Sequence, residues 1–363
     1  MPADRIRSLD TLRGLMLVIM AVDHLDLYGP VYRVTYETFG FVSAAEGFVL
    51  VSGIVAGVVY GGYAEVPGRL AAAVRRRLAT LWRYHLIITA GLLAAWLLLP
   101  GLRPAGGATA AVARALGGAV LLNQEPPLDI LPLYLLFVAL LPWVLAGLRR
   151  GRAGAVLAVS GVLWLLDQVL GGQSWYPVVI RFSLGATPVV WQPNAFHLLA
   201  WQFLFVAGAC LGWRIRTGHA VGGPGVTRGA IAVAVAVALV CLALRHGILL
   251  DALPRTMPAV SRESLGWLRL LNVGVFGVLL AGLARRRPRW LEVPWLELLG
   301  RHALLVFTWQ TLLQIFLRPS YLEAAARWGI AARLIFLAAV VASLTLPALW
   351  REGRSRGRSA SAG

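Results

Sequence analysis

Apolar stretches of about 20 residues recur along the whole chain and limit its fold more than any other feature. A helix needs about 20 consecutive apolar residues to cross the hydrocarbon core of a bilayer. Here 59% of the residues are hydrophobic and only 14% are charged, whereas a typical soluble domain carries about 25% charged residues. The sequence therefore predicts an all-α protein that is embedded in the membrane and crosses it repeatedly.

The apolar stretches predict about ten transmembrane helices. Their approximate ranges are 8–28, 41–62, 84–100, 129–148, 153–170, 196–213, 228–246, 266–284, 300–317 and 329–349. Arginine-rich segments precede the first stretch, follow the last and occupy every second connection between them (residues 5–7, 69–83, 149–152, 214–228, 285–289 and 351–358). Because arginine-rich loops stay in the cytoplasm, this alternation predicts that both termini are cytoplasmic.

The same pattern predicts the domain organisation. Residues 1–350 are expected to form one transmembrane domain, and residues 351–363 a disordered basic tail in which arginines alternate with small residues. Two long outer loops, 101–128 and 171–195, are interrupted by proline and glycine. Segments of this kind lie on the membrane surface or re-enter the membrane. Glycines at every fourth position between residues 53 and 61 are typical of closely packed helices.

The net charge of +18 does not indicate nucleic-acid binding, because the arginines lie between membrane-spanning stretches and set their orientation. Cys210 and Cys241 both lie inside apolar stretches. They are predicted to be inert core residues, and neither a disulfide framework nor a metal site is expected.

The first apolar stretch is unusual because it carries Asp10, Arg13, Asp23 and His24. Arg13 and His24 lie on nearly the same face of the predicted helix, about 16 Å apart. Ionisable groups inside a membrane span cost several kcal/mol unless they are paired, so they indicate function by default. A structural alternative is an ion pair between Asp10 and Arg13 that holds the helix end, with His24 at the interface.

The direction of the first two helices predicts a partner for His24. The first helix runs outward and the second runs inward, so Glu46, at the start of the second helix, also lies near the outer end. A carboxylate that orients a histidine is the usual way to make a general base for a hydroxyl group. Asp23 is about 100° around the helix from His24 and is the weaker candidate partner.

Two further groups of polar residues lie at opposite membrane faces. On the inner side, cationic side chains that could hold phosphate together with Arg13 are Arg83, His85, Arg301 and His302. On the outer side, residues that could line an acceptor vestibule are Asp129, Asn194, His197 and Trp191. Taken singly, Asp129, Asn194 and His197 are better explained as interfacial capping groups, and Trp191 fits an interfacial aromatic belt.

Several segments resemble the OpgC-type branch of the membrane acyltransferase-3 superfamily. They are SLDTLRGLMLVIMAVDH, FGFVSAAEGFVLVSG, RRRLATLWRYH, PLDILPLYLL, NAFHLLAWQFLFVAGACLG and GRHALLVF. The resemblance implies a transfer of acyl groups from cytoplasmic acyl-CoA to extracytoplasmic glycans, and OpgC-type members succinylate periplasmic glucans. It also implies that His24 is the catalytic base, that Arg13 supports the donor site, and that no cofactor is tightly bound.

We therefore expect a membrane O-acyltransferase of the bacterial cytoplasmic (inner) membrane. Its partners would be acyl-CoA, an extracytoplasmic glycan and the bilayer, with the oligomeric state left open. The competing hypothesis is a transporter or flippase of a glycan or acidic metabolite, which would use the same buried charges as a permeation path. A transporter needs no general base, so the two hypotheses differ in what they require of His24.

Overall fold

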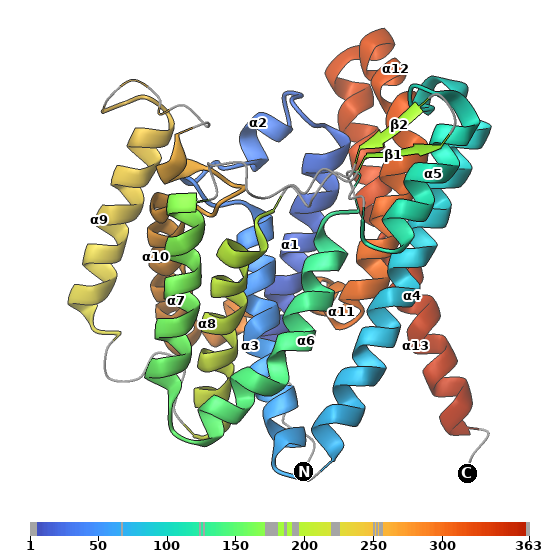
Figure 1. The fold of residues 1–363 in the computed structure, drawn as a ribbon. Coiled ribbons are helices and arrows are strands. Elements are labelled where there is room, and N and C mark those ends of the chain that lie inside the picture. Colours follow the sequence, from blue (N-terminus) through green and yellow to red (C-terminus); the bar gives the residue numbers. More distant parts are fainter. Residues whose placement is uncertain are drawn as a thin grey trace. The chain divides into compact units, whose positions relative to one another are not determined.

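The computed structural model describes residues 6–66, 68–122, 125, 128–170, 181–184, 187–190, 196–218, 226–249, 251, 253 and 257–360. These residues are almost all helical, apart from one short hairpin, which confirms the predicted fold class in its main feature (Figure 1). The chain divides into two compact units. Unit 1 comprises Ser52–Ala220 and Leu253–Leu271, and unit 2 comprises Pro2–Val51, Val221–Ala252 and Asn272–Gly363.

Unit 1 is built mainly from antiparallel helices. Its elements are the later part of α3 (Ala44–Ala64), α4 (Arg69–Leu98), the 3₁₀ turn Pro100–Leu102, α5 (Gly107–Ala119), α6 (Ile130–Arg149), α7 (Ala153–Leu170), β1 (Arg181–Leu184), β2 (Thr187–Val190), α8 (Leu198–Arg216), the 3₁₀ turn Pro258–Val260 and the start of α10 (Trp267–Arg286). The strands pair antiparallel, with Arg181 opposite Val190 and Leu184 opposite Thr187. They lie within the loop predicted for residues 171–195.

Helices α3 and α8 pack backbone against backbone. A Cβ atom added at Gly53 or Gly57 would overlap the carbonyl oxygen of Phe205 or Ala209, and one added at Gly212 would overlap that of Ile54. Only glycine permits such an approach, which is the usual role of small residues spaced four apart in membrane helices. The close packing predicted from the glycine spacing is confirmed.

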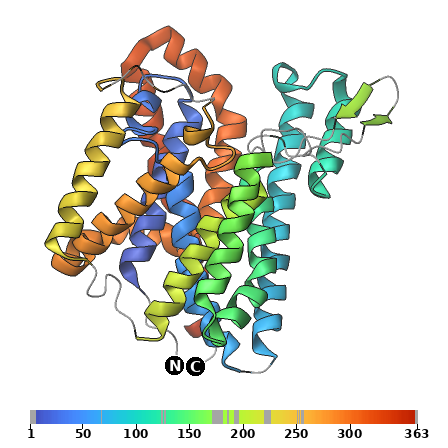
Figure 2. The same cartoon turned by 60° about the vertical axis from the view of Figure 1, so that its left-hand side comes forward.

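Helix α5 folds back along α4 within the loop predicted for residues 101–128. The ring Nε2 of His85 lies 2.8 Å from the carbonyl oxygen of Gly118, near the end of α5. His85 precedes the end of α4 by 13 residues, or about 20 Å of helix. The loop therefore returns along α4 (Figures 1 and 2). Of the two predicted alternatives, this path fits a segment that re-enters better than one that stays at the surface.

Unit 2 combines the two ends of the chain. Its elements are α1 (Arg7–Leu25), α2 (Tyr32–Thr35), the first part of α3, α9 (Arg228–Arg245), the later part of α10, the 3₁₀ turn Pro288–Leu291, α11 (Pro294–Arg301), α12 (Ala303–Ser343) and α13 (Thr345–Ala360). One apolar core packs Leu25 of α1 against Tyr321, Leu337 and Val340 of α12. Another joins Leu12, Val51 and Leu291.

Helix α12 is a helical hairpin that turns at Gly329. This residue has φ 69° and ψ −150°, outside the helical region and accessible to glycine without strain. The two halves pair antiparallel, because the indole of Trp309 donates to Ser343 Oγ at 3.3 Å and the rings of Tyr321 and Phe336 meet edge to face. The two predicted helices 300–317 and 329–349 correspond to these halves, but the first half continues up to the turn.

Among the residues that the structure describes, seven helices are long and apolar enough to cross a membrane. They are Ala44–Ala64, Arg69–Leu98, Ile130–Arg149, Leu198–Arg216, Arg228–Arg245, Trp267–Arg286 and the joined segment Ala303–Arg354. Helix α1 is not among them, and α7 counts only as a shorter apolar helix. The prediction of several membrane-spanning helices is supported, while the count of ten and the cytoplasmic termini stay predictions.

Two predicted boundaries differ from the structure. Helix α4 begins at Arg69, not at residue 84, because alanine, leucine and arginine are strong helix formers even where the sequence is too charged to be buried in lipid. Helix α13 extends to Ala360 and so covers most of the predicted disordered tail.

Candidate functional site

The charged first helix crosses the short helix α11 at very close range. A Cβ atom added at Gly14 would overlap the carbonyl oxygen of Leu296, and one added at Gly300 would overlap that of Asp10. Gly14 follows Arg13 directly, and Gly300 precedes Arg301. Arg13 and Arg301, both predicted to hold an anion, therefore each neighbour a glycine at which α1 and α11 cross.

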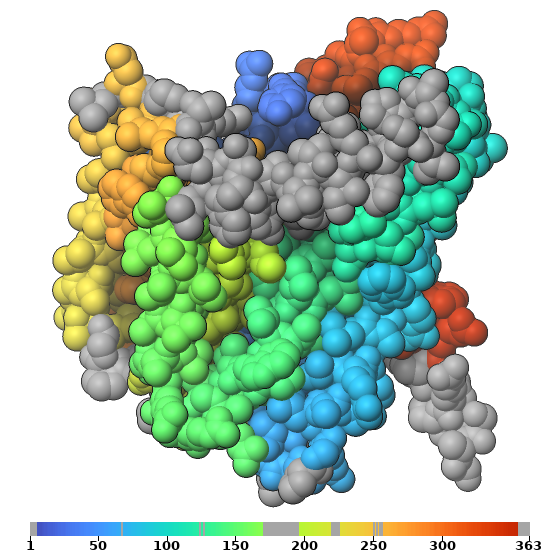
Figure 3. Space-filling model, viewed as in Figure 1, coloured from blue at the N-terminus to red at the C-terminus, as the bar shows by residue number. Residues whose placement is uncertain are grey.

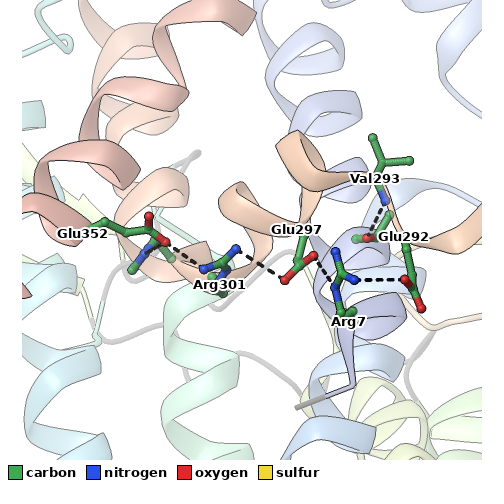
Figure 4. A network of polar contacts seen from close by, with 8 residues as sticks. Arg7, Glu292, Val293, Glu297, Arg301 and Glu352 are labelled. Atoms are coloured by element: carbon green, nitrogen blue, oxygen red, sulfur yellow. Dashed lines mark hydrogen bonds and ion pairs between the residues drawn. The ribbon is translucent and has the colours of Figure 1, made fainter. Parts of the chain in front are cut away.

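A chain of ion pairs connects this crossing to α13 (Figure 4). Arg7 contacts Glu292 at 3.1 Å and Glu297 at 2.9 Å, and Glu297 in turn contacts Arg301 at 3.3 Å. Arg301 reaches Glu352 at 2.8 Å, and His302 Nε2 lies 3.7 Å from the same carboxylate. Carboxylates therefore already offset the charge of Arg301, which weakens the prediction that Arg301 and His302 bind phosphate.

Arg13 lies beside the beginning of α3. Its guanidinium sits over the Phe48 ring, 5.8 Å from the centroid, and a Cβ at Gly47 would come within 3.0 Å of the Met16 sulfur. Met16 precedes His24 by eight residues, or about 12 Å along the helix. The first turn of α3 therefore lies beside the middle of α1, deeper than the helix directions alone indicated.

Glu46 is fully buried and caps its own helix. Its carboxylate accepts hydrogen bonds from the backbone N–H of Ser43, at 2.9 Å, and from the Ser43 hydroxyl. Ser43 and Glu46 form the S-x-x-E pattern of a capping box. This signal is readable in the sequence and was missed. The pairing of Glu46 with His24 stays a prediction.

The other end of α1 carries His24 and two buried carboxylates. His24 is half-buried in the last turn. Asp23 is 5% exposed and accepts a hydrogen bond from the Thr35 hydroxyl at 2.5 Å, which joins α1 to α2. The carboxylate predicted as the weaker partner of His24 is therefore engaged by α2.

Asp26, just beyond the end of α1, is a buried anchor that sequence reasoning did not single out. Its Oδ1 accepts from the Tyr321 hydroxyl and from Arg333 Nη1, both at 2.5 Å, and its Oδ2 accepts from the backbone N–H of Val31 and Tyr32 at 2.7 and 3.0 Å. Burial alone would raise the pKa of the Asp26 carboxyl, but these hydrogen bonds outweigh it and lower the pKa. Asp26 thus fixes the helix end that follows His24.

Arg83 and His85 belong to unit 1 and face different surroundings. Arg83 is exposed and lines a pocket, whereas His85 is fully buried against Gly118. The two side chains point in different directions, because residues two positions apart along a helix are about 200° apart. Their joint role in a phosphate site stays a prediction. Whether Arg13 and Arg83 act on one donor stays a prediction.

A second polar cluster in unit 1 contains His197. Its Nδ1 lies 2.9 Å from Asp167 Oδ2, and Asp167 is 1% exposed. Arg262 stacks on Phe196, the residue before His197, at 5.0 Å. Asp129 is the residue just before α6; burial raises the pKa of its carboxyl, and the positive charge of Arg262 opposes this shift. Of the predicted acceptor residues, the structure describes His197 and Asp129. Arg262 contacts the residue before His197 and acts electrostatically on Asp129.

This cluster contains a histidine oriented by a buried carboxylate, the arrangement needed for proton transfer from a hydroxyl group. Asp167 is the lone acidic residue of α7, and its position inside an apolar stretch was the available signal for it. The remaining predicted acceptor residues, Trp191 and Asn194, lie outside the described part of the chain.

The fold and its charged first helix define a helical, polytopic membrane protein with ionisable groups buried among its helices. The description of the OpgC protein family matches residues 5–356, nearly the whole chain. The chain therefore belongs to the OpgC family, as its motifs predicted. No curated protein and no solved structure matches it significantly.

Proposed function

We propose that this protein is a membrane O-acyltransferase that moves an acyl group from cytoplasmic acyl-CoA to a hydroxyl group of an extracytoplasmic glycan. Succinyl is the first candidate for the acyl group, and the bacterial cytoplasmic (inner) membrane is the proposed location. The observation that carries the proposal is the family membership across residues 5–356. The charged helix α1, which places Arg13 and His24 on one face, supports it.

The proposed reaction needs one proton transfer. His24 removes the proton of a sugar hydroxyl, the resulting alkoxide attacks the thioester carbonyl, and the CoA thiolate leaves. Histidine suits this step because its pKa lies near neutral pH. Asp26 serves as a positioning residue, because it ties the chain two residues after His24 to α2 and to both halves of α12. His197, held by Asp167, and Asp129 are proposed to bind the acceptor.

The test is acyl transfer by purified protein carrying His24→Ala or His24→Gln. Loss of a general base costs roughly 10²–10⁴ in rate, so both variants are expected to lose detectable transfer while keeping their size-exclusion profile. The control is His246→Ala, an exposed histidine that contacts only the Thr38 carbonyl oxygen among the described residues. Full specific activity in His24→Gln contradicts the proposal and is what the transporter hypothesis expects.

A further inference from the structure

A pocket of about 920 Å³ in unit 1 has cationic and apolar walls. Arg76, Thr80 and Arg83 line it from α4. These residues are four and three positions apart, so they lie on one face of the helix, and the two arginines are separated by about 10 Å along its axis. The pocket therefore presents two positive charges and a hydroxyl group in one row.

The opposite wall is apolar. Leu135 and Ala139 contribute to it from α6, and Leu121, after the end of α5, also lines the pocket. Figure 3 shows α4 and α6 side by side on one face of the molecule. Leu121 has φ 63°, a strained conformation for a residue with a branched side chain. A strained residue at a pocket wall indicates that the surrounding contacts hold this shape.

Among the described residues, no carboxylate offsets the charge of either arginine of the pocket. Arg83 makes only a long contact of 3.5 Å to the Thr80 hydroxyl, and neither Arg83 nor Arg76 forms an ion pair with a carboxylate among the described residues. Arg301 differs, because Glu297 and Glu352 already contact it. A second cavity, along α12, has a purely aliphatic and aromatic lining except for Ser343.

We propose that this pocket binds the phosphate of an anionic amphiphile, with the phosphate oxygens at Arg76 and Arg83 and the apolar chain against Leu135 and Ala139. Arginine forks match phosphate oxygens in geometry and charge. An anionic phospholipid and the acyl-CoA donor share this chemistry. If the bound phosphate belongs to a lipid, the inference is independent of the proposed function. If it belongs to acyl-CoA, the inference rests on the proposed function and assigns the donor phosphates to α4.

The experiment compares wild-type protein with the double variant Arg76→Gln/Arg83→Gln in nanodiscs. The probes are CoA, CoA lacking its 3′-phosphate, phosphatidylglycerol and phosphatidylcholine. Trp82 lines the pocket, and the difference in tryptophan fluorescence between wild type and Trp82→Phe reports binding. The matched control, Arg69→Gln/Arg75→Gln, removes two exposed arginines of the same helix that do not line the pocket. Ala139→Phe fills the apolar wall without changing any charge.

The double variant is expected to bind one of the phosphate probes at least about tenfold more weakly, because each charge-assisted contact contributes substantially. The control should bind like wild type, and Ala139→Phe should weaken the same probe. Selective loss of CoA assigns the site to the donor, and selective loss of phosphatidylglycerol assigns it to lipid. Equal binding of both probes by wild type and double variant overturns the inference.

Failure of the proposed function gives a different result. If the protein transfers no acyl group but the double variant loses phosphatidylglycerol binding, the phosphate site stands and the enzyme assignment does not. If acyl transfer proceeds and neither probe responds to Arg76→Gln/Arg83→Gln, the enzyme assignment stands and the phosphate site does not.

Discussion

At the scale of single residues, a buried carboxylate connects several elements of unit 2. Asp26 is 1% exposed and uses both oxygens, with donors from α2 and from both sides of the turn in α12. A buried charge is stable only when its partners replace water. Removal of the partner charge should therefore be far more costly than loss of a surface ion pair.

Asp26→Ala should lower the free energy of unfolding by about 3–5 kcal/mol, the usual cost of breaking a buried charged pair. Tyr321→Phe, which removes one donor and keeps the ring, should cost about 1–3 kcal/mol. Thermal unfolding in detergent measures both. Glu65→Gln is the control, since its ion pair with Arg216 is exposed and contributes little. Equal melting temperatures for Asp26→Ala and the control would contradict the anchoring role.

The lowered pKa of Asp26 predicts a pH dependence of stability. A group whose folded pKa lies below its unfolded value, about 3.9 for Asp, stabilises the fold above that value and stops doing so as the pH falls through the folded pKa. The melting temperature should therefore fall below about pH 4. The melting temperature of Asp26→Asn should fall less at low pH. If it falls as much as in wild type, other carboxylates cause the pH dependence.

Sequence reasoning recognised part of this residue-level structure. The charged residues of α1 stood out because charge inside an apolar stretch is costly. Asp26 did not, because its importance comes from Tyr321 and Arg333, which lie some 300 positions away and meet it only in the fold. Glu46 was recognised as unusual, but its local capping role with Ser43 is also encoded by spacing and was overlooked.

At the scale of elements, glycines decide which helices can touch. Gly14 and Gly300 let α1 and α11 approach until backbone meets backbone. Long apolar helices were predictable from their composition, whereas α11 has only eight residues and gave no such signal. The start of α4 at Arg69 and the extension of the first half of α12 up to Gly329 were not predicted, because hydropathy describes lipid exposure and not helix length.

Gly14→Ala and Gly300→Ala should each destabilise the protein by about 1–3 kcal/mol, because the added methyl group overlaps a backbone oxygen that cannot move aside. Gly274→Ala in α10 is the control, since a Cβ there meets nothing within 4 Å and alanine favours the helix. The measurement is the melting temperature of each variant. A stabilising effect of Gly14→Ala would contradict the close crossing.

At the scale of the whole molecule, the distribution of arginines predicts the orientation in the membrane. In unit 1, the start of α4 at Arg69, the end of α6 at Arg149 and the end of α8 at Arg216 are each basic. Alternating helices of one bundle place these ends together. The positive-inside rule predicts that this end faces the cytoplasm.

Reporter fusions test this orientation. Because α4 begins at Arg69, the informative sites are Gly68, Gly151 and Thr217, where a cytoplasmic signal is expected. A fusion at Gly106, between α4 and α5, should give an outer signal. A cytoplasmic signal at Gly106 would show that α4 does not cross the membrane and would contradict the outer location of the acceptor site.

The contacts of Asp26 also have a consequence for the order of events during synthesis. Arg333 follows Asp26 by 307 residues. At roughly 5–20 residues per second, a ribosome needs about 15–60 s to produce that stretch. The first helix is thus made long before the side chain that neutralises the carboxylate at its end. The final arrangement of α1 can form only after α12 has been made, so the helix made first is among the last to be locked in place.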